Sequence, residues 1–149
     1  RFPVVDVAVE LFFGSYHDVD SSEMSFRIAA RSCLKKVFEA AGPILLEPIM
    51  EVDIHVDKEF MGDILNDITS RRGRVLGMGG SDESGSGVSV VKAQVPLAEM
   101  LRYAIDLRAM TSGKATFEMR FSHYDPISGK IAEKVIEERK KFFEEEANK

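Results

Sequence analysis

The stretch "MEVDIHVDKEFMGDILNDITSRRGRVLGM", Met50 to Met78, decides the fold because its hydrophobic period changes twice. From Met50 to Val56, apolar and polar residues alternate, which is the period of a half-buried strand. Apolar residues at helical spacing then predict a helix that ends before Gly73: Met61, Ile64, Leu65 and Ile68. The segment "RVLGM", residues 74–78, indicates a second strand. The stretch is therefore expected to form a strand–helix–strand unit.

The segment that follows predicts a second unit of the same kind. "VSVVKAQV", residues 88–95, indicates a strand, and Pro96 is typical of a helix start. We expect this helix to end at Gly113 with four residues facing inward: Met100, Leu101, Ala104 and Leu107. Phe117, Met119 and Phe121 alternate through a final strand. The order βαββαβ, with one polar sheet face, predicts a ferredoxin-like α+β sandwich.

The first 48 residues predict a strand, a turn, a helix and a connector. "VVDVAVELFF", residues 4–13, alternates as a strand, and Asp20 with Glu23 has the spacing of a helix capping box. The helix is expected to end at Gly42-Pro43 and to bury one stripe: Phe26, Ala30, Cys33, Leu34, Val37 and Ala41. "PILLEP", residues 43–48, suits an extended connector because of its two prolines. A last helix is predicted from Lys130 to about Glu146.

Composition limits the classes of function. The chain has 149 residues, 44% of them hydrophobic, and a formal net charge of −5, so any contact with RNA is expected to be local. No apolar run is long enough for a membrane span, and no secretory leader is expected. The single Cys33 favours a reducing compartment, and the cytoplasm is the expected location.

No residue cluster predicts catalysis or metal binding. His17 with Asp18 and Asp20 lacks a second His or Cys at ligand spacing. "GGSDESGSG", residues 79–87, lacks the Gly-Lys-Ser/Thr ending of a phosphate-binding loop and is expected to be a hairpin loop. Three further polar residues are expected to be ordinary surface or satisfied groups: His55, His123 and Tyr124. We therefore expect no catalytic residue, no metal and no cofactor in this chain.

Two features bear on RNA binding. Arg27, Arg31 and Lys35 form a basic stripe on the helix after the turn, which suits a phosphate backbone. The alternative is a solvated face in which Glu23 supports Arg27, and both remain open. The open sheet face is predicted to carry acidic residues in place of aromatic ones, so base stacking there is not expected: Glu51, Asp53 and Glu118.

Long motifs resemble the C-terminal part of bacterial elongation factor G, a family of translational GTPases. They are "GSYHDVDSSEM", "LLEPIM", "SRRGRVLGM", "VPLAEM", "YAIDLR", "TSGKATFEM" and "FSHYD". The resemblance implies a partial fourth domain with a ribosomal-protein-S5-domain-2-like β/α fold at residues 1–42, a linker at 43–47 and a ferredoxin-like fifth domain at 48–127. It also implies that residues 128–149 form a helix that returns to the fourth domain.

The resemblance implies sites and partners as well. The turn formed by Gly14, Ser15, Tyr16, His17 and Asp18 corresponds to the tip that enters the decoding-centre A site and meets tRNA and mRNA. Arg71 and Arg72 would contact rRNA near the GTPase-associated region of the large ribosomal subunit. GTP and Mg²⁺ would belong to another domain of the parent, a GTPase that drives translocation, so this piece would not be an enzyme.

Two alternatives remain at this point. One is a paralogue that serves ribosome recycling or ribosome protection, and the other is a free-standing ferredoxin-like interaction module. No membrane partner is expected. Because residues 4–13 would present an unpaired strand edge, self-association through this segment is also expected.

Overall fold

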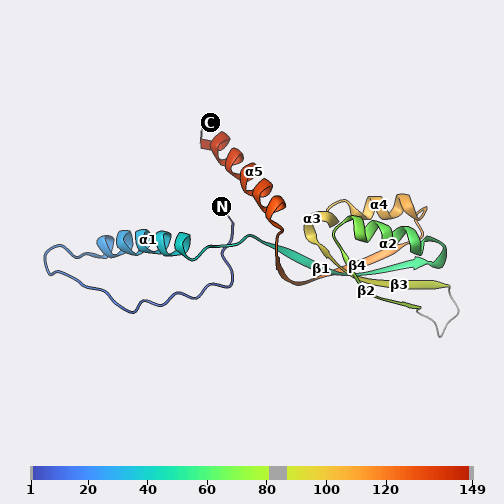
Figure 1. Ribbon diagram of the computed structural model, residues 1–149, viewed down its shortest axis with the longest axis horizontal. Helices are drawn as coiled ribbons and strands as arrows, with labels where there is room; N and C mark the ends of the chain where they lie inside the picture. Colours follow the sequence, from blue (N-terminus) through green and yellow to red (C-terminus); the bar gives the residue numbers. More distant parts are fainter. Residues whose placement is uncertain (1, 81–86, 148–149) are drawn as a thin grey trace. The chain divides into compact units, whose positions relative to one another are not determined.

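A computed structural model describes residues 2–80 and 87–147, and the chain divides into two units. Unit 1 comprises Arg1–Ile44 and Gly129–Lys149, and unit 2 comprises Leu45–Ser128 (Figure 1). Of the predicted hairpin loop at 79–87, residues 81–86 lie outside the described residues.

Unit 2 contains a four-stranded antiparallel sheet in the order β2-β3-β1-β4. The strands are β1 (Leu46–Asp57), β2 (Arg74–Gly80), β3 (Val88–Pro96) and β4 (Thr116–Pro126). The helices are the 3-10 turn η1 (Lys58–Phe60), α2 (Met61–Ser70), α3 (Leu97–Met100) and α4 (Tyr103–Met110). Figure 1 shows α2, α3 and α4 on one side of the sheet. The predicted ferredoxin-like α+β fold is confirmed.

The core lies between this sheet and its helices. On central strand β1, Val52, Ile54 and Val56 are fully or almost fully buried, as the alternating pattern predicts. Val91 of β3 pairs with Ile54, and Ala93 pairs with Val52. The helix face from α2 contributes Ile64 and Ile68, both with no exposed surface. Burial of these side chains is the main source of stability for unit 2.

The turn after α2 has little space. Arg72 adopts a left-handed backbone conformation with φ 61°, which is uncommon for a residue with a Cβ. A Cβ on the next residue, Gly73, would lie 2.7 Å from Ile68 Cγ2 and 2.8 Å from the Ile68 carbonyl oxygen. The chain therefore needs glycine at this position to pass from α2 into β2.

The predicted single helix after Pro96 is wrong, because the structure contains two short helices, α3 and α4. Leu101 is 79% exposed, and Ala104 is also exposed, although both were expected to face inward. Arg102, with φ −116°, interrupts the helical path and changes which residues face the sheet. Tyr103 is buried instead, with its ring 5.0 Å from the ring of Phe117.

Strand β1 begins earlier than Met50 and includes Pro48, within the segment expected to be an extended connector. Proline cannot donate a main-chain hydrogen bond, which usually excludes it from a central strand. Here Pro48 pairs only with Tyr124 of β4, since the pairing of β1 with β3 begins at Ile49. At Pro48, β1 is therefore not yet paired with β3, so the missing N–H of proline interrupts no pairing with that strand.

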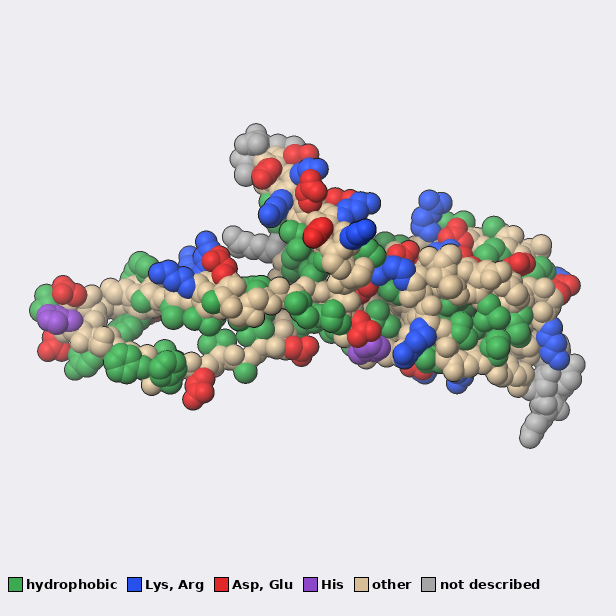
Figure 2. All heavy atoms as spheres, viewed as in Figure 1, with side chains coloured by type: hydrophobic (Ala, Val, Ile, Leu, Met, Phe, Trp, Pro, Cys, Tyr) green, Lys and Arg blue, Asp and Glu red, His purple; other side chains and the backbone are tan. Residues whose placement is uncertain are grey.

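In unit 1 the helices are α1 (Glu23–Ala40) and α5 (Gly129–Ala147). The predicted strand at 4–13 is wrong: none of the described residues pairs with it, and a strand requires a hydrogen-bonded neighbour. No residue of α1 is buried, so the predicted stripe from Phe26 to Ala41 lies at the surface. In Figure 2, hydrophobic side chains are visible on the surface along the segment before α1. Self-association through residues 4–13 stays a prediction.

Candidate nucleic-acid interface

The turn between residues 14 and 22 connects the extended N-terminal segment to α1. The main-chain N–H of His17 donates to Ser21 Oγ at 2.8 Å, and the N–H of Ser21 donates to the His17 carbonyl oxygen at 3.0 Å. The predicted cap at Asp20 is wrong: α1 begins at Glu23, and Ser22 Oγ accepts the N–H of Ser25 at 3.2 Å. Ser22 is the N-cap because its side chain, and not that of Asp20, is in the position that reaches the third helical residue.

All five predicted tip residues are exposed. Gly14, Ser15 and Asp18 lie on the surface. Tyr16 is 75% exposed, and the His17 side chain is 72% exposed. No described residue packs over these two rings, so local packing does not explain why a tyrosine and a histidine occupy this turn. The turn instead presents an aromatic ring and an imidazole to the surroundings.

The contacts of the His17 imidazole are weak and local. Nδ1 lies 3.4 Å from the N–H of Val19 and 3.6 Å from Asp20 Oδ2. Nε2 forms no hydrogen bond with residues 2–80 or 87–147. Within those ranges, no group of three or more His, Cys, Asp or Glu side chains is arranged to hold a metal ion. The chemistry that this turn offers is stacking and hydrogen bonding.

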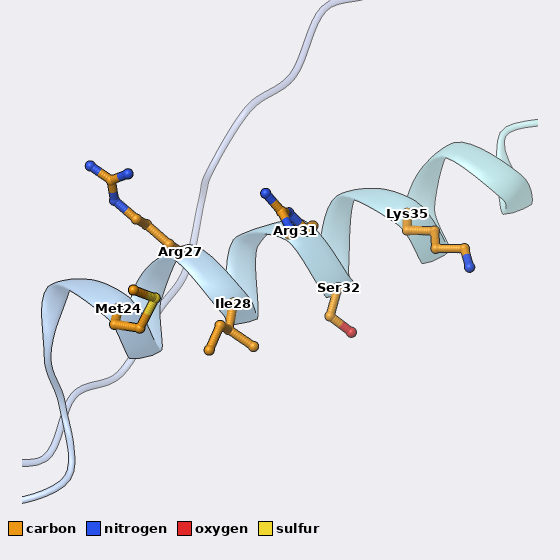
Figure 3. A pocket seen from close by; sticks show the side chains of 6 residues that line it. All are labelled: Met24, Arg27, Ile28, Arg31, Ser32 and Lys35. Atoms are coloured by element: carbon orange, nitrogen blue, oxygen red, sulfur yellow. The ribbon is translucent and has the colours of Figure 1, made fainter. Parts of the chain in front are cut away.

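The basic stripe on α1 borders a shallow groove. Figure 3 shows the six side chains that line it: Met24, Arg27, Ile28, Arg31, Ser32 and Lys35. Arg27 also forms a 2.7 Å ion pair with Glu23, which supports the solvated-face alternative. Because both side chains are more than 70% exposed, this pair contributes little to stability and leaves Arg27 free to exchange partners. Met24 and Ile28, which were not predicted as site residues, place apolar surface beside the basic stripe.

Arg71 and Arg72 are occupied by contacts inside unit 2. Arg71 donates to Asp67 Oδ2 at 2.8 Å, to the Glu99 carbonyl oxygen at 2.8 Å and to Asp106 Oδ2 at 2.7 Å. Arg72 donates to both carboxylate oxygens of Glu47 at 2.7 and 2.9 Å, and to Glu99 at 3.1 Å. These contacts give both arginines a structural role. Their predicted contact with rRNA stays a prediction.

The contacts shift several pKa values in unit 2. The hydrogen bond to Asp67, with a second to Asp106, raises the pKa of Arg71, although burial opposes the shift. The hydrogen bond to Glu47 likewise raises the pKa of Arg72. Burial raises the pKa of Tyr103, whose ring lies 5.0 Å from the Arg71 guanidinium. These groups keep one protonation state near neutral pH, as expected of structural side chains.

The open face of the sheet is polar, as predicted. Glu51 pairs with Arg120 at 2.9 Å across β1 and β4, and Asp53 lies opposite Lys92 of β3 and Glu118 of β4. The hydrogen bond from Arg120 lowers the pKa of Glu51. This face carries charged side chains, of which Glu51 and Arg120 form an ion pair, and it does not form an aromatic platform for bases.

At the end of β4, His123 is a satisfied surface group, as predicted. Its Nδ1 lies 2.9 Å from Ser122 Oγ, and its Nε2 lies 3.3 Å from Asp125. Tyr124 and Phe121 form an aromatic pair with ring centres 5.1 Å apart. Both rings are about half exposed, which the alternation of β4 did not reveal because the strand lies at the edge of the sheet.

The described helices include none that is both long and apolar enough to cross a membrane. Unit 2 is a ferredoxin-like α+β domain, and unit 1 supplies an exposed turn that leads into a basic helix. Residues 44–135 match the family described as elongation factor G C-terminus, and residues 1–42 match elongation factor G, domain IV. The chain therefore belongs to the elongation factor G family and represents part of its C-terminal region.

Individual relatives agree with this assignment. The chain is 51% identical to elongation factor G of Aquifex pyrophilus over 93% of its length, and 52% identical to an elongation factor G-like protein of Thermotoga maritima over 97%. A solved structure from Thermus thermophilus superimposes with a TM-score of 0.77 at 42% identity, covering 87% of this chain and 19% of that chain. The chain spans 19% and 21% of the two relatives' lengths.

Proposed function

We propose that this chain is the ribosome-binding part of a translation factor that promotes GTP-dependent movement of tRNA and mRNA. In this proposal the turn from Gly14 to Asp18 enters the decoding-centre A site. The observation that carries it is the exposure of Tyr16 and His17 on a turn whose main chain is fixed by Ser21. Stacking and hydrogen bonding by two such rings require no particular base sequence, which suits a factor that acts on every codon.

Another part of the factor would bind and hydrolyse GTP. The regions matched here are domain IV and the C-terminus of the family, neither of which is a GTP-binding domain. We assign GTP and Mg²⁺ to a GTPase domain elsewhere in the parent protein, and we place the parent in the cytoplasm. Unit 2 would face the GTPase-associated region of the large subunit, and the last helix would belong with domain IV.

The basic stripe is proposed as a supporting contact with RNA. Arg27, Arg31 and Lys35 lie on the helix that begins directly after the tip, so RNA that meets the tip lies within reach of the same helix. At a formal net charge of −5, the chain as a whole does not attract RNA strongly. The stripe and the tip would therefore act only when the whole factor is bound to the ribosome.

The test compares the rate of mRNA movement with the rate of GTP hydrolysis in the full-length factor. His17→Ala is expected to slow mRNA movement while ribosome-stimulated phosphate release stays near its normal rate, because the two processes occur in different domains. His55→Ala, which removes an imidazole from β1 of unit 2, is the matched control. Equal slowing of both processes by His17→Ala, or of neither, would exclude the proposed role of the tip.

A paralogue for ribosome recycling or ribosome protection is the remaining alternative. One of the similar relatives carries the name elongation factor G-like protein, which does not separate these roles. The family assignment gives no support to a free-standing interaction module. Translocation and ribosome-splitting assays on the same full-length factor distinguish the two remaining functions.

A further inference from the structure

Ser21 occupies an unusual position in the tip turn. Among residues 2–37 it is the only one that is partly buried, and all the others are exposed. Its Oγ accepts the N–H of His17 at 2.8 Å, and its own N–H donates to the His17 carbonyl oxygen at 3.0 Å. Both main-chain groups of His17 are thus bound by one residue, so Ser21 closes the turn at His17.

The imidazole makes two weak contacts within the turn. In the neutral tautomer in which Nδ1 accepts the N–H of Val19, at 3.4 Å, the ring proton is on Nε2. The charged groups near the ring are Asp20, with Oδ2 3.6 Å from Nδ1, and the neighbouring Asp18. Nε2–H then remains as a donor for an acceptor outside the described residues, such as a phosphate oxygen, a ribose hydroxyl or a base carbonyl.

We propose that Ser21 is the positioning residue that holds His17 with its Nε2–H available to an RNA acceptor. The proposal rests on the function proposed above for the tip. The role proposed for the Ser21 hydroxyl is to accept the His17 N–H, not to contact the RNA. Its role would be to reduce the number of orientations that His17 samples before it meets the RNA.

The neighbouring serines have a different role, which supplies a matched control. Ser22 Oγ caps α1 by accepting the N–H of Ser25 at 3.2 Å, and Ser25 Oγ donates to the Asp20 carbonyl oxygen at 3.3 Å. Neither side chain forms a hydrogen bond with His17. Removing the hydroxyl of Ser22 therefore tests the helix start, whereas removing that of Ser21 tests the turn.

The first experiment measures structure alone, on the 149-residue chain. In Ser21→Ala, hydrogen exchange of the His17 amide is expected to accelerate about tenfold, the effect of losing one hydrogen bond. Nitrogen NMR of the imidazole is expected to show a reduced share of the Nε2–H form. Ser21→Thr retains the hydroxyl and should behave like the wild type, and Ser22→Ala should accelerate exchange at Ser25 but not at His17. Unchanged exchange at His17 in Ser21→Ala would overturn the proposal.

The second experiment measures movement of mRNA in the full-length factor. Ser21→Ala is expected to slow movement severalfold, Ser21→Thr to restore it, and Ser21→Ala to add no slowing in a His17→Ala background. Equal slowing in both backgrounds, or none in either, would overturn the role of Ser21 while leaving the tip function intact. If His17→Ala itself has no effect, the proposed function fails and the role of Ser21 in it fails with it. The exchange data then still show whether Ser21 closes the turn.

Discussion

Removing the guanidinium of Arg71 is expected to destabilise unit 2 strongly. Its side chain is 15% exposed and joins the end of α2 to α3 and α4 through Asp67, the Glu99 carbonyl and Asp106. In Arg71→Ala, the Asp67 carboxylate, itself 15% exposed, loses the only cation that the described residues place beside it. An ionised group left partly buried without its partner is costly.

The loss in the free energy of unfolding of Arg71→Ala depends on which of the former partners become hydrated. A hydrogen bond to a charged group contributes about 1.5–3 kcal/mol, and the bond to Asp67 counts almost fully because both partners are largely buried. Asp106 is 39% exposed, so it rehydrates and its bond counts for less. We expect Arg71→Ala to lower the free energy of unfolding by about 3 kcal/mol. Arg71→Lys should lower the free energy of unfolding by about half as much, since lysine keeps the charge but not the forked geometry of the guanidinium.

Native-state hydrogen exchange at the buried Val52 and Val91 amides measures this loss, because both residues lie in the core of unit 2. Arg108→Ala is the control: it removes an arginine from α4 that forms no side-chain ion pair with the described residues. Its effect should stay within about 0.5 kcal/mol. If Arg71→Ala costs no more than Arg108→Ala, the contacts described for Arg71 do not stabilise the unit.

Three further predictions concern backbone space, pH and charge. Gly73→Ala should lower the melting temperature of unit 2 because its Cβ would meet Ile68 at 2.7 Å, whereas Gly62→Ala, with no atom within 4 Å, should raise it slightly. The hydrogen bond from Arg120 lowers the pKa of Glu51. The stability that this bond contributes is therefore complete above the ordinary pKa of 4.5 and is lost as the pH falls through the lowered pKa. An NMR titration of the Glu51 carboxyl group checks this, and Arg120→Gln should return its pKa towards 4.5. Reversing Arg27 and Arg31 to glutamate in the full-length factor should weaken ribosome binding and lower its salt slope by about two. Unchanged binding across the salt titration would leave these arginines as a solvated face.

The sequence predicted unit 2 well because its signals are local and agree with one another. The alternation around Val52 and Ile54 and the helical spacing of Ile64 and Ile68 each identify one buried face. The break at Arg102 was not predictable in this way. The apolar residues on both sides of it fit one continuous helix, and only packing against the sheet selects Tyr103 over Leu101 for burial.

Unit 1 shows the opposite case. Residues 4–13 have the pattern of a strand, but a strand also requires a partner, and hydrophobic alternation carries no information on whether one is present. The tip residues were predicted only through the resemblance to a family. The role of Ser21 had no signal in the sequence at all, because a serine in a turn is ordinary and only its two contacts with His17 distinguish it.

Arg72 also explains how the start of β1 is held where the chain enters unit 2. Leu46 pairs with Pro126, and the N–H of Ile127 donates to the Leu45 carbonyl oxygen at 3.0 Å, so the first and last residues of unit 2 lie side by side. Next to this point, Glu47 is 9% exposed and is bound by both terminal nitrogens of Arg72, which also contacts Glu99. The strained turn at Arg72 therefore ties the entry of β1 to the start of α3. In the proposed function, a mechanical force that reaches unit 2 at the start of β1 would be transmitted to the core of the unit, because this end of the strand is bound by Arg72.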